Sequence, residues 1–149
     1  MLNTGGPVEM PWKDKVSAIV EGWFLGGEVG NAEANVLTGR TNPSGKLPVT
    51  FPKRIEDNPT FATFPGKNLE AHYSEDLLVG YRWYDNKAIE PLFPFGYGLT
   101  YTRFSYANLK IEGGAGLTVG FDVTNTGKRA GADVPQVYVE AKSAAGTRA

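Results

Sequence analysis

The segment from Glu90 to Tyr106, EPLFPFGYGLTYTRFSY, constrains the fold of this chain more than any other part of the sequence. It contains two prolines, two glycines and six aromatic residues, which are Phe93, Phe95, Tyr97, Tyr101, Phe104 and Tyr106. Proline and glycine interrupt a long helix, and so many aromatic side chains need an apolar environment. The segment therefore predicts a buried junction between two parts of the chain, and neither a long helix nor a free linker.

The residues before this junction predict two short helices. Apolar residues recur at the i, i+3, i+4, i+7 and i+8 spacing of an amphipathic helix over residues 14–24, at Val16, Ile19, Val20, Trp23 and Phe24. Asp14 is the expected cap of this helix. A second helix is expected over residues 31–37, and Gly39 is expected to end it.

Strand patterns follow the second helix. Leu47, Val49 and Phe51 alternate as in a strand, and Pro48 indicates an edge or a bulge because proline has no N–H to donate to a neighbouring strand. Residues 52–71 lack a periodic pattern and predict a surface loop, whereas residues 77–84 have strand-like composition. This half of the chain is therefore expected to be α/β.

After Tyr106 the pattern becomes that of an antiparallel β-structure. Apolar residues alternate at Leu109 and Ile111, at Leu117, Val119, Phe121 and Val123, and again at Val137 and Val139. The sequence Asn125-Thr126-Gly127 predicts a turn between the second and the third of these groups. A complete β-sandwich of the immunoglobulin type needs about seven strands, and only about three fit before Ala149. An incomplete β-sandwich segment is therefore expected here.

Composition and charge exclude several classes of function. The chain has 149 residues, 41% hydrophobic residues and a formal net charge of −1. This charge attracts neither nucleic acid nor anionic lipid, so no nucleic-acid or membrane partner is expected. The sequence shows no signal peptide and no apolar run of the roughly 20 residues that span a bilayer. As written, the chain is expected to be soluble and cytoplasmic.

The metal-binding residue types are scarce. The chain has no cysteine and only one histidine, His72. A zinc site made of thiolates and imidazoles is therefore excluded, and no cofactor is expected.

Four motifs in a fixed order resemble the C-terminal part of glycoside hydrolase family 3, the β-glucosidase family. They are TGGPVEMPW at residues 4–12, GGEVGNAEANVLTGRTNPSGKLPVTFP at 26–52, YSEDLLVGYRWYD at 73–85, and the aromatic segment described above. The resemblance covers residues 2–139. It implies that residues 1–102 form the second half of an α/β sandwich domain, and that residues 103–149 are the first strands of a fibronectin type III-like domain. Both ends of the chain are expected to fall inside these domains.

The same resemblance implies a retaining glycosidase that acts on β-linked glucosides and oligosaccharides. In this family a barrel domain supplies the nucleophilic aspartate, and an earlier loop supplies the acid/base glutamate; neither has a matching position here. The chain is therefore expected to be a fragment that contributes scaffold and part of the active-site wall. Two alternatives stay open, namely a non-catalytic carbohydrate-binding or assembly module, and a weak hydrolase whose site is assembled by oligomerisation.

Few residues qualify as site candidates. If the chain is active, the weak catalytic candidates are Glu28 and Glu75, although an acid in the first turn of a helix and an ion pair between Glu75 and Arg82 are the structural alternatives. Trp12, Glu28 and Trp83 are the substrate-binding candidates. Trp12 follows a candidate strand, where open α/β sheets bind ligands, and Trp83 alternates with Tyr81 on a predicted strand.

Incomplete sheets also have consequences for assembly. Unpaired strand edges and uncovered apolar faces favour pairing with another chain. The sequence therefore predicts a homo-oligomer, and exchange of elements between copies is one way to form it.

Overall fold

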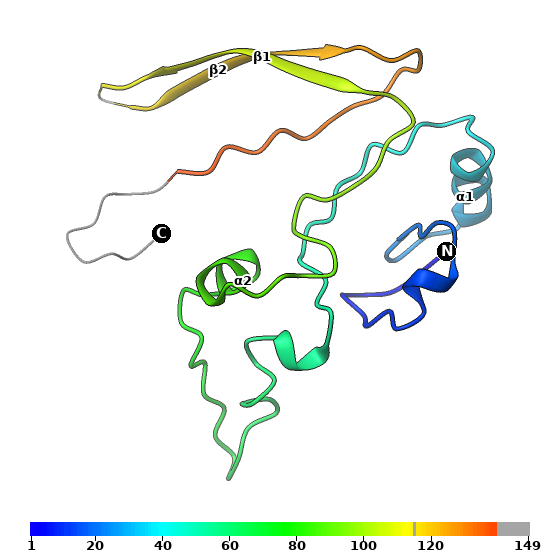
Figure 1. Ribbon diagram of the computed structural model, residues 1–149. Coiled ribbons are helices and arrows are strands. Elements are labelled where there is room, and N and C mark those ends of the chain that lie inside the picture. The colour runs from blue at the N-terminus through cyan, green and yellow to red at the C-terminus, as the bar shows by residue number, and fades with distance from the viewer. Residues whose placement is uncertain (115, 140–149) are drawn as a thin grey trace. The chain divides into compact units, whose positions relative to one another are not determined.

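The computed structural model describes residues 1–114 and 116–139, and contains both helices and strands (Figure 1). The elements in chain order are the 3-10 helix η1 (Lys13–Lys15), α1 (Val29–Leu37), the 3-10 helix η2 (Ile55–Asp57), α2 (Tyr81–Lys87), β1 (Phe104–Glu112) and β2 (Thr118–Asn125). The two strands form a small antiparallel sheet. The expected mixed α/β (α+β) class is thus confirmed.

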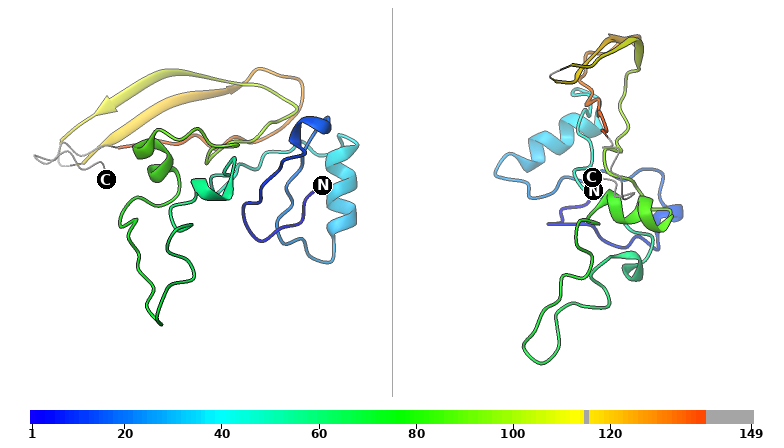
Figure 2. Two further views of the ribbon diagram at one scale, coloured as in Figure 1. Left: turned by 60° about the horizontal axis from the view of Figure 1, so that its bottom comes forward. Right: turned by 90° about the vertical axis from the view of Figure 1, so that its left-hand side faces the viewer.

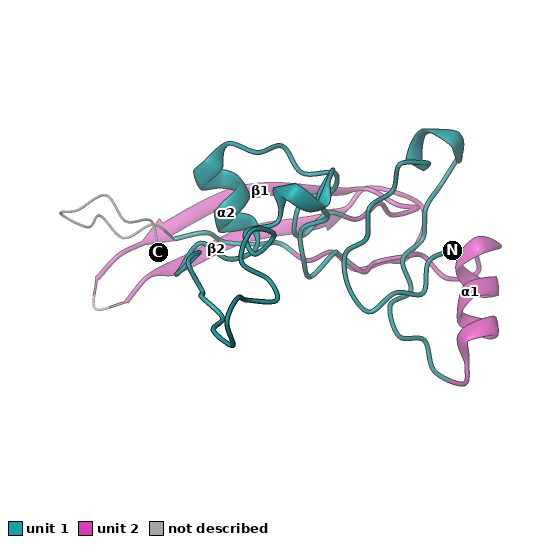
Figure 3. Cartoon of the chain, turned by 90° about the horizontal axis from the view of Figure 1, so that it is seen from below, with its two compact units in different colours: residues 1–26, 46–97, 135–149 teal, residues 27–45, 98–134 magenta. Residues whose placement is uncertain are grey.

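The chain forms two compact units, and each is made of segments that are far apart in the sequence (Figure 3). Unit 1 comprises Met1–Gly26, Lys46–Tyr97 and Pro135–Ala149, and unit 2 comprises Gly27–Gly45 and Gly98–Val134.

In unit 2 the alternating residues after the aromatic segment form an antiparallel hairpin, which agrees with the predicted antiparallel β-structure. Phe104 pairs with Asn125 and Glu112 pairs with Thr118, so that β1 and β2 lie side by side along their length (Figure 2). The register shifts between Ala107 and Lys110. Asn108, which lies inside this bulge, has a φ of 54°, a left-handed conformation that asparagine tolerates better than most residues.

The last predicted β segment is the alternation at Val137 and Val139. No strand is assigned to Val137 or Val139, although alternation predicted one there. Both residues lie at the end of the described range, and residues 140–149 lie outside it.

Helix α1 also belongs to unit 2 and confirms the second predicted helix. Gly39 follows it with a φ of 73°, as expected of a glycine that ends a helix. Asn42 joins the segment after α1 to the residues before β1. Its Oδ1 accepts hydrogen bonds from the backbone N–H of Tyr101 at 2.6 Å and from the hydroxyl of Thr100 at 2.9 Å. The Tyr101 hydroxyl donates to the carbonyl of Val36 at 3.0 Å.

Unit 1 has its apolar centre at Phe51, which is only 1% exposed. The Phe51 ring lies 5.9 Å from that of Trp23 and 6.4 Å from that of Phe93. The backbone N–H groups of Phe51 and Leu47 donate to the carbonyls of Phe93 and Tyr97, both at 2.8 Å. Only Met10, Phe51 and Tyr84 are buried hydrophobic residues in the part of the chain that the structure describes.

The strand predicted over residues 47–51 is reduced to an isolated bridge between Phe51 and Phe93. Pro48 explains this outcome, because it lacks the N–H that a continuous ladder from Leu47 to Phe51 would need. The prediction of a buried aromatic junction is wrong for its tyrosines. Tyr97, Tyr101 and Tyr106 are exposed, whereas Phe93 and Phe95 are half-buried.

The helix predicted over residues 14–24 is wrong. Only η1 forms there, and Asp14 binds Lys13 at 3.0 Å instead of capping a helix. Residues 18–20 are not helical, and Glu21 forms a parallel bridge with Leu2, supported by a hydrogen bond from the Leu2 N–H to the Val20 carbonyl at 2.8 Å. Val16, Ile19 and Val20 are β-branched and suit this extended pairing, which overrides their helical spacing.

The strand predicted over residues 77–84 is also wrong, because its second half is helix α2. Gly80 precedes the helix with a φ of 56°. Tyr81 and Tyr84 are three positions apart, so they share a helical face, and Tyr84 is buried. The surface loop predicted over residues 52–71 is confirmed apart from the single turn of η2 and an isolated bridge between Lys67 and Glu70.

Much apolar surface stays uncovered. Among the described residues, Phe24, Phe64 and Leu69 are large apolar side chains with at least 80% of their surface exposed. None of the helices in residues 1–114 and 116–139 is long and apolar enough to cross a membrane.

Candidate functional site

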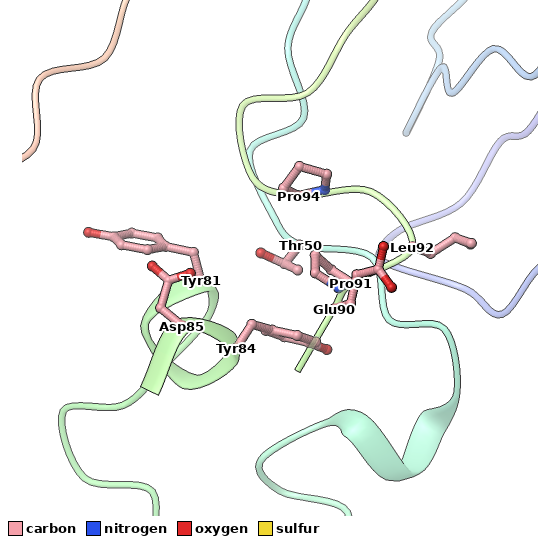
Figure 4. A pocket seen from close by; sticks show the side chains of 8 residues that line it. All are labelled: Thr50, Tyr81, Tyr84, Asp85, Glu90, Pro91, Leu92 and Pro94. Atoms are coloured by element: carbon pink, nitrogen blue, oxygen red, sulfur yellow. The ribbon is translucent and has the colours of Figure 1, made fainter. Parts of the chain in front are cut away.

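A pocket of about 380 Å³ lies in unit 1, beside helix α2 (Figure 4). The helix supplies three of the lining residues, Tyr81, Tyr84 and Asp85, which lie at positions i, i+3 and i+4 and therefore share one face. The segment that follows the helix and the end of the LPVT motif supply the remainder, which are Glu90, Pro91, Leu92, Pro94 and Thr50. The pocket is thus formed by residues that are up to 44 positions apart in the chain.

The aromatic wall of the pocket is held by ring contacts. The ring of Tyr81 stacks on that of Phe95, with centroids 5.5 Å apart and planes 23° apart. The Tyr138 ring meets the Tyr81 ring edge-on, with centroids 5.4 Å apart. Burial, and to a smaller extent the charge of Asp57, raises the pKa of the Tyr84 hydroxyl. Tyr84 is therefore a neutral aromatic surface at neutral pH.

The polar side chains of the pocket are two carboxylates and three hydroxyls. Glu90 accepts a hydrogen bond from Lys53, and this bond, with the charge of the same lysine, lowers the pKa of Glu90. Asp85 is exposed. The hydroxyl oxygen of Thr50 is buried and has no hydrogen-bond partner; Figure 4 shows it directed to the side on which Tyr81 and Asp85 lie.

Glu75 lies in unit 1 and is buried, with 8% of its surface exposed. Its Oε2 atom is also buried and has no hydrogen-bond partner. The expected ion pair with Arg82 is not formed, because the Arg82 guanidinium lies over the ring of Tyr81, 6.0 Å from the centroid. Arg82 follows Tyr81 on a helix and not on a strand. Its side chain therefore points in a different direction from the one expected for a strand.

The two tryptophan candidates occupy different local settings. The Trp83 indole N–H donates to the carbonyl of Asp57 at 3.0 Å, and the Lys87 ammonium lies 5.1 Å from its ring centroid. Trp83 is on helix α2, so its predicted alternation with Tyr81 along a strand is wrong. Trp12 is half-buried and immediately precedes η1. No strand precedes it in residues 3–11, which corrects the expected position at a strand end.

Glu28 is the only one of the four candidates in unit 2. It is exposed and immediately precedes α1, and its Oε2 accepts a hydrogen bond from the Asn31 amide at 2.6 Å. No hydrogen bond, ion pair or ring contact in the described ranges joins any two of Trp12, Glu75 and Trp83. The structure therefore does not gather the sequence candidates into one site.

Sequence reasoning missed most of the pocket, and in particular Thr50, Tyr84, Asp85 and Glu90. The segment YRWYD carried a signal for three of its residues, because a helical interpretation places Tyr81, Tyr84 and Asp85 on one face. Nothing in the sequence indicates that Thr50 lies beside them. Within the described part of the chain, no group of three or more histidine or acidic residues is arranged to hold a metal ion.

Comparison with known proteins gives consistent results over almost the whole chain. The family-wide sequence profile described as the glycosyl hydrolase family 3 C-terminal domain matches residues 1–101. A β-glucosidase of Rhizobium radiobacter is 50% identical over 152 residues, which cover 97% of this chain and 19% of that protein. β-Glucosidase B of Emericella nidulans is 53% identical over 156 residues, which cover 95% of this chain and 18% of that protein.

Solved structures agree with the sequence relatives. β-Glucosidase 3B from Thermotoga neapolitana in complex with glucose superposes with a TM-score of 0.82 at 47% identity, covering 87% of this chain and 19% of that one. β-Glucosidase from Kluyveromyces marxianus in complex with glucose superposes with a TM-score of 0.80 at 40% identity, covering 84% and 15%. The chain thus spans about a fifth of the length of these relatives.

Proposed function

Since this chain belongs to glycosyl hydrolase family 3, as part of the family's C-terminal domain, we propose that it is the portion of a retaining β-glucosidase that supplies scaffold and part of the active-site wall. The observation that carries this proposal is the coverage. Nearly all of the chain, 97%, aligns at 50% identity with 19% of a β-glucosidase. A similarity of this extent supports a role as part of a larger catalytic unit, and we propose β-linked glucosides and oligosaccharides as the substrates of that unit.

The chain is proposed to lack both catalytic carboxylates. A retaining glycosidase needs two carboxyl groups about 5–5.5 Å apart, one as nucleophile and one as acid and base. Of the two candidates from the sequence, Glu28 is exposed and accepts a hydrogen bond from Asn31, and Glu75 has a buried Oε2 without a hydrogen-bond partner. In the pocket, Glu90 is bound to Lys53 and its pKa is lowered, which disfavours the protonated form that a general acid needs.

We retain the domain boundary expected from the sequence, with residues 1–102 in the α/β sandwich domain and 103–149 in a fibronectin type III-like domain. Two observations support this division. The family profile ends at residue 101, and β1 begins at Phe104.

Trp12 and Glu28 are proposed as the wall residues that meet substrate. Trp12 is half-buried and so keeps part of its indole accessible. Glu28 is exposed, and Asn31 orients its carboxylate from one side. Trp83 remains the third candidate, although its contacts with Asp57 and Lys87 favour a structural role.

A chimeric enzyme tests the main proposal. The matching C-terminal segment of Thermotoga neapolitana β-glucosidase 3B is replaced by this chain, and hydrolysis of a chromogenic β-glucoside is measured. We expect deletion of the segment to abolish turnover and this chain to restore it. In the active chimera, Trp12→Ala and Glu28→Gln are expected to raise KM more than they lower kcat. A chimera that folds but does not turn over would contradict the proposal.

The isolated chain distinguishes the alternatives. We expect no turnover from the chain alone, nor from its Glu28→Gln and Glu75→Gln variants. Turnover that one of these substitutions abolishes would support a hydrolase assembled by oligomerisation. Saturable glucose binding without turnover would support a carbohydrate-binding module, a role for which the aromatic and acidic lining of the α2 pocket is suited.

Self-association of the isolated chain also remains a proposal. Both strands of the hairpin have mostly exposed residues, among them Leu109, Ile111 and Val123, and such surfaces favour pairing with a second copy. Light scattering measures the mass in solution, and a monodisperse monomer would contradict this expectation.

A further inference from the structure

We infer that Glu75 is the anchor at which the preceding part of the family 3 polypeptide docks on unit 1, by placing a cationic side chain against the Glu75 carboxylate. The inference rests on the proposed function, because it takes the chain to be a portion of a longer enzyme. It assigns to Glu75 a role in holding this chain against the preceding part of the enzyme.

The first observation is that Glu75 is a buried acid without a partner. It is 8% exposed, and its buried Oε2 atom accepts no hydrogen bond. Burial of an ionised carboxylate is costly unless a donor compensates for the lost water. Native proteins pair nearly all such groups. The compensating donor is therefore expected from outside the described residues.

Asp57 shows what a paired acid looks like in the same unit. It is 6% exposed, and Arg54 donates to its Oδ1 at 2.8 Å. The two acids have similar burial but differ in their partners. This contrast indicates that the described part of the chain itself supplies a donor for one buried carboxylate of unit 1 and supplies none for Glu75.

Four cations of unit 1 are engaged with groups other than Glu75. Arg54 binds Asp57, Lys53 binds Glu90, Arg82 lies over Tyr81, and Lys87 lies over Trp83. A positive group from another segment would therefore meet Glu75 without competition from these four.

The residues that flank Glu75 have the character of an interface. Tyr73 is 81% exposed, and Leu77 and Val79 are also exposed although they are large and apolar. A buried charged group within an apolar surface resembles the centre of a protein interface, where desolvated polar groups carry much of the binding energy. We call residues 73–79 the Glu75 segment.

Thr50 supports the same conclusion independently. Its hydroxyl is the second buried side-chain group without a partner among the described residues, and it also belongs to unit 1. Two such groups in one unit fit a surface that a further segment covers, and Glu75 is not an isolated irregularity.

The proposed occupant is the part of the enzyme that lies before this region. The chain matches a C-terminal domain and covers only 19% of the Rhizobium radiobacter relative, so most of such a polypeptide is available to cover the Glu75 segment. Its contact with Glu75 is expected to be an arginine or a lysine, because a carboxylate is best compensated by a charged donor.

Opposite effects of one substitution in two settings test the inference. Glu75→Gln is made in the isolated chain and in the Thermotoga chimera, and urea unfolding is measured in both. In the isolated chain we expect a smaller unfolding constant, by about tenfold, because a buried carboxyl group without a partner is replaced by an amide. In the chimera we expect a larger constant, by about tenfold or more, because the partner cation is left alone. Glu75→Leu should enlarge both effects.

Glu70→Gln is the matched control, because Glu70 is an exposed glutamate of the same region, 3.6 Å from His72. It is expected to leave both unfolding constants within about twofold of the unmodified protein. Hydrogen exchange is a second measurement that does not depend on the variants. Amides of the Glu75 segment should exchange at least about tenfold more slowly in the chimera than in the isolated chain.

Each other result overturns the inference. The same sign of the Glu75→Gln effect in both settings would show that no cation from the preceding part meets Glu75. Association of the isolated chain that Glu75→Gln abolishes would make a second copy the occupant, and stabilisation by glucose that the same change abolishes would make it a sugar. An inactive unmodified chimera contradicts the proposed function, whereas an active chimera without the change of sign contradicts only the anchor.

Discussion

Phe51 provides the most direct test of how unit 1 is held together. It is only 1% exposed, and its ring lies between those of Trp23 and Phe93, at centroid distances of 5.9 and 6.4 Å. It is also one of only three buried hydrophobic residues in the described ranges. Phe51→Ala therefore removes the centre of a small core that has few other contacts to compensate for the loss.

The size of the effect follows from two contributions. Truncation of a buried phenylalanine to alanine removes about 100 Å² of apolar surface from the core, worth about 2.5 kcal/mol. The space left behind adds about 24 cal/mol per Å³ of cavity that does not collapse, which brings the total into the range of about 3–5 kcal/mol. We expect a value near 4 kcal/mol, a large part of the roughly 5–15 kcal/mol that stabilises an ordinary domain.

Urea unfolding followed by tryptophan fluorescence measures this loss, because Trp23 lies beside Phe51 and reports on the same core. Phe51→Leu keeps most of the apolar volume and is expected to cost less than about 2 kcal/mol. Phe64→Ala is the control for an exposed phenylalanine, since Phe64 is 80% exposed, and is expected to change the unfolding free energy by less than about 0.5 kcal/mol. Similar losses for Phe51→Ala and Phe64→Ala would refute this account of unit 1.

Three further predictions concern single contacts. Lys53 lowers the pKa of Glu90 in the folded chain. The stability from this pair is therefore lost as the pH falls from about 4.5 through the lower folded pKa. Glu90→Gln should remove this acid dependence from urea midpoints measured between about pH 5 and 3. Burial raises the pKa of Tyr84, so its contribution is complete below pH 10 and is lost as the pH rises above 10, and Tyr84→Phe should flatten the alkaline decline in midpoint. Asn108 has a φ of 54°, and its amide donates to Asp122, a hydrogen bond that both variants lose. Asn108→Ala should therefore destabilise the hairpin by about 1 kcal/mol more than Asn108→Gly does, as measured by circular dichroism during heating; equal effects would argue against the strained bulge.

The sequence predicted the parts of the fold in which local preference and tertiary structure agree. The alternation around Leu117 to Val123 corresponds to β2, and residues 31–37 before Gly39 correspond to α1. These segments need no information from distant residues. The order of the family motifs was also sufficient to identify the family, because it requires no knowledge of local conformation.

The errors arose where a distant segment decides the local structure. Ile19 and Val20 have helical spacing, but Leu2 provides a backbone partner 19 residues from Glu21, and periodicity does not report such pairing. In the YRWYD segment, aromatic residues with high strand propensity form a helix because Tyr84 packs into the core. The pocket was missed for the same reason, since Thr50 reaches helix α2 only through the fold.

The hydrogen bonds of Asn42 have a consequence for the order of events during synthesis. Asn42 binds Thr100 and Tyr101, which are 58 and 59 positions later in the chain. At translation rates of about 5–20 residues per second, α1 and its neighbours wait about 3–12 s on the ribosome before these partners exist. During that interval the nascent Gly27–Gly45 segment has no completed unit to join, and a slow ribosome or a missing holdase chaperone would lengthen its exposure.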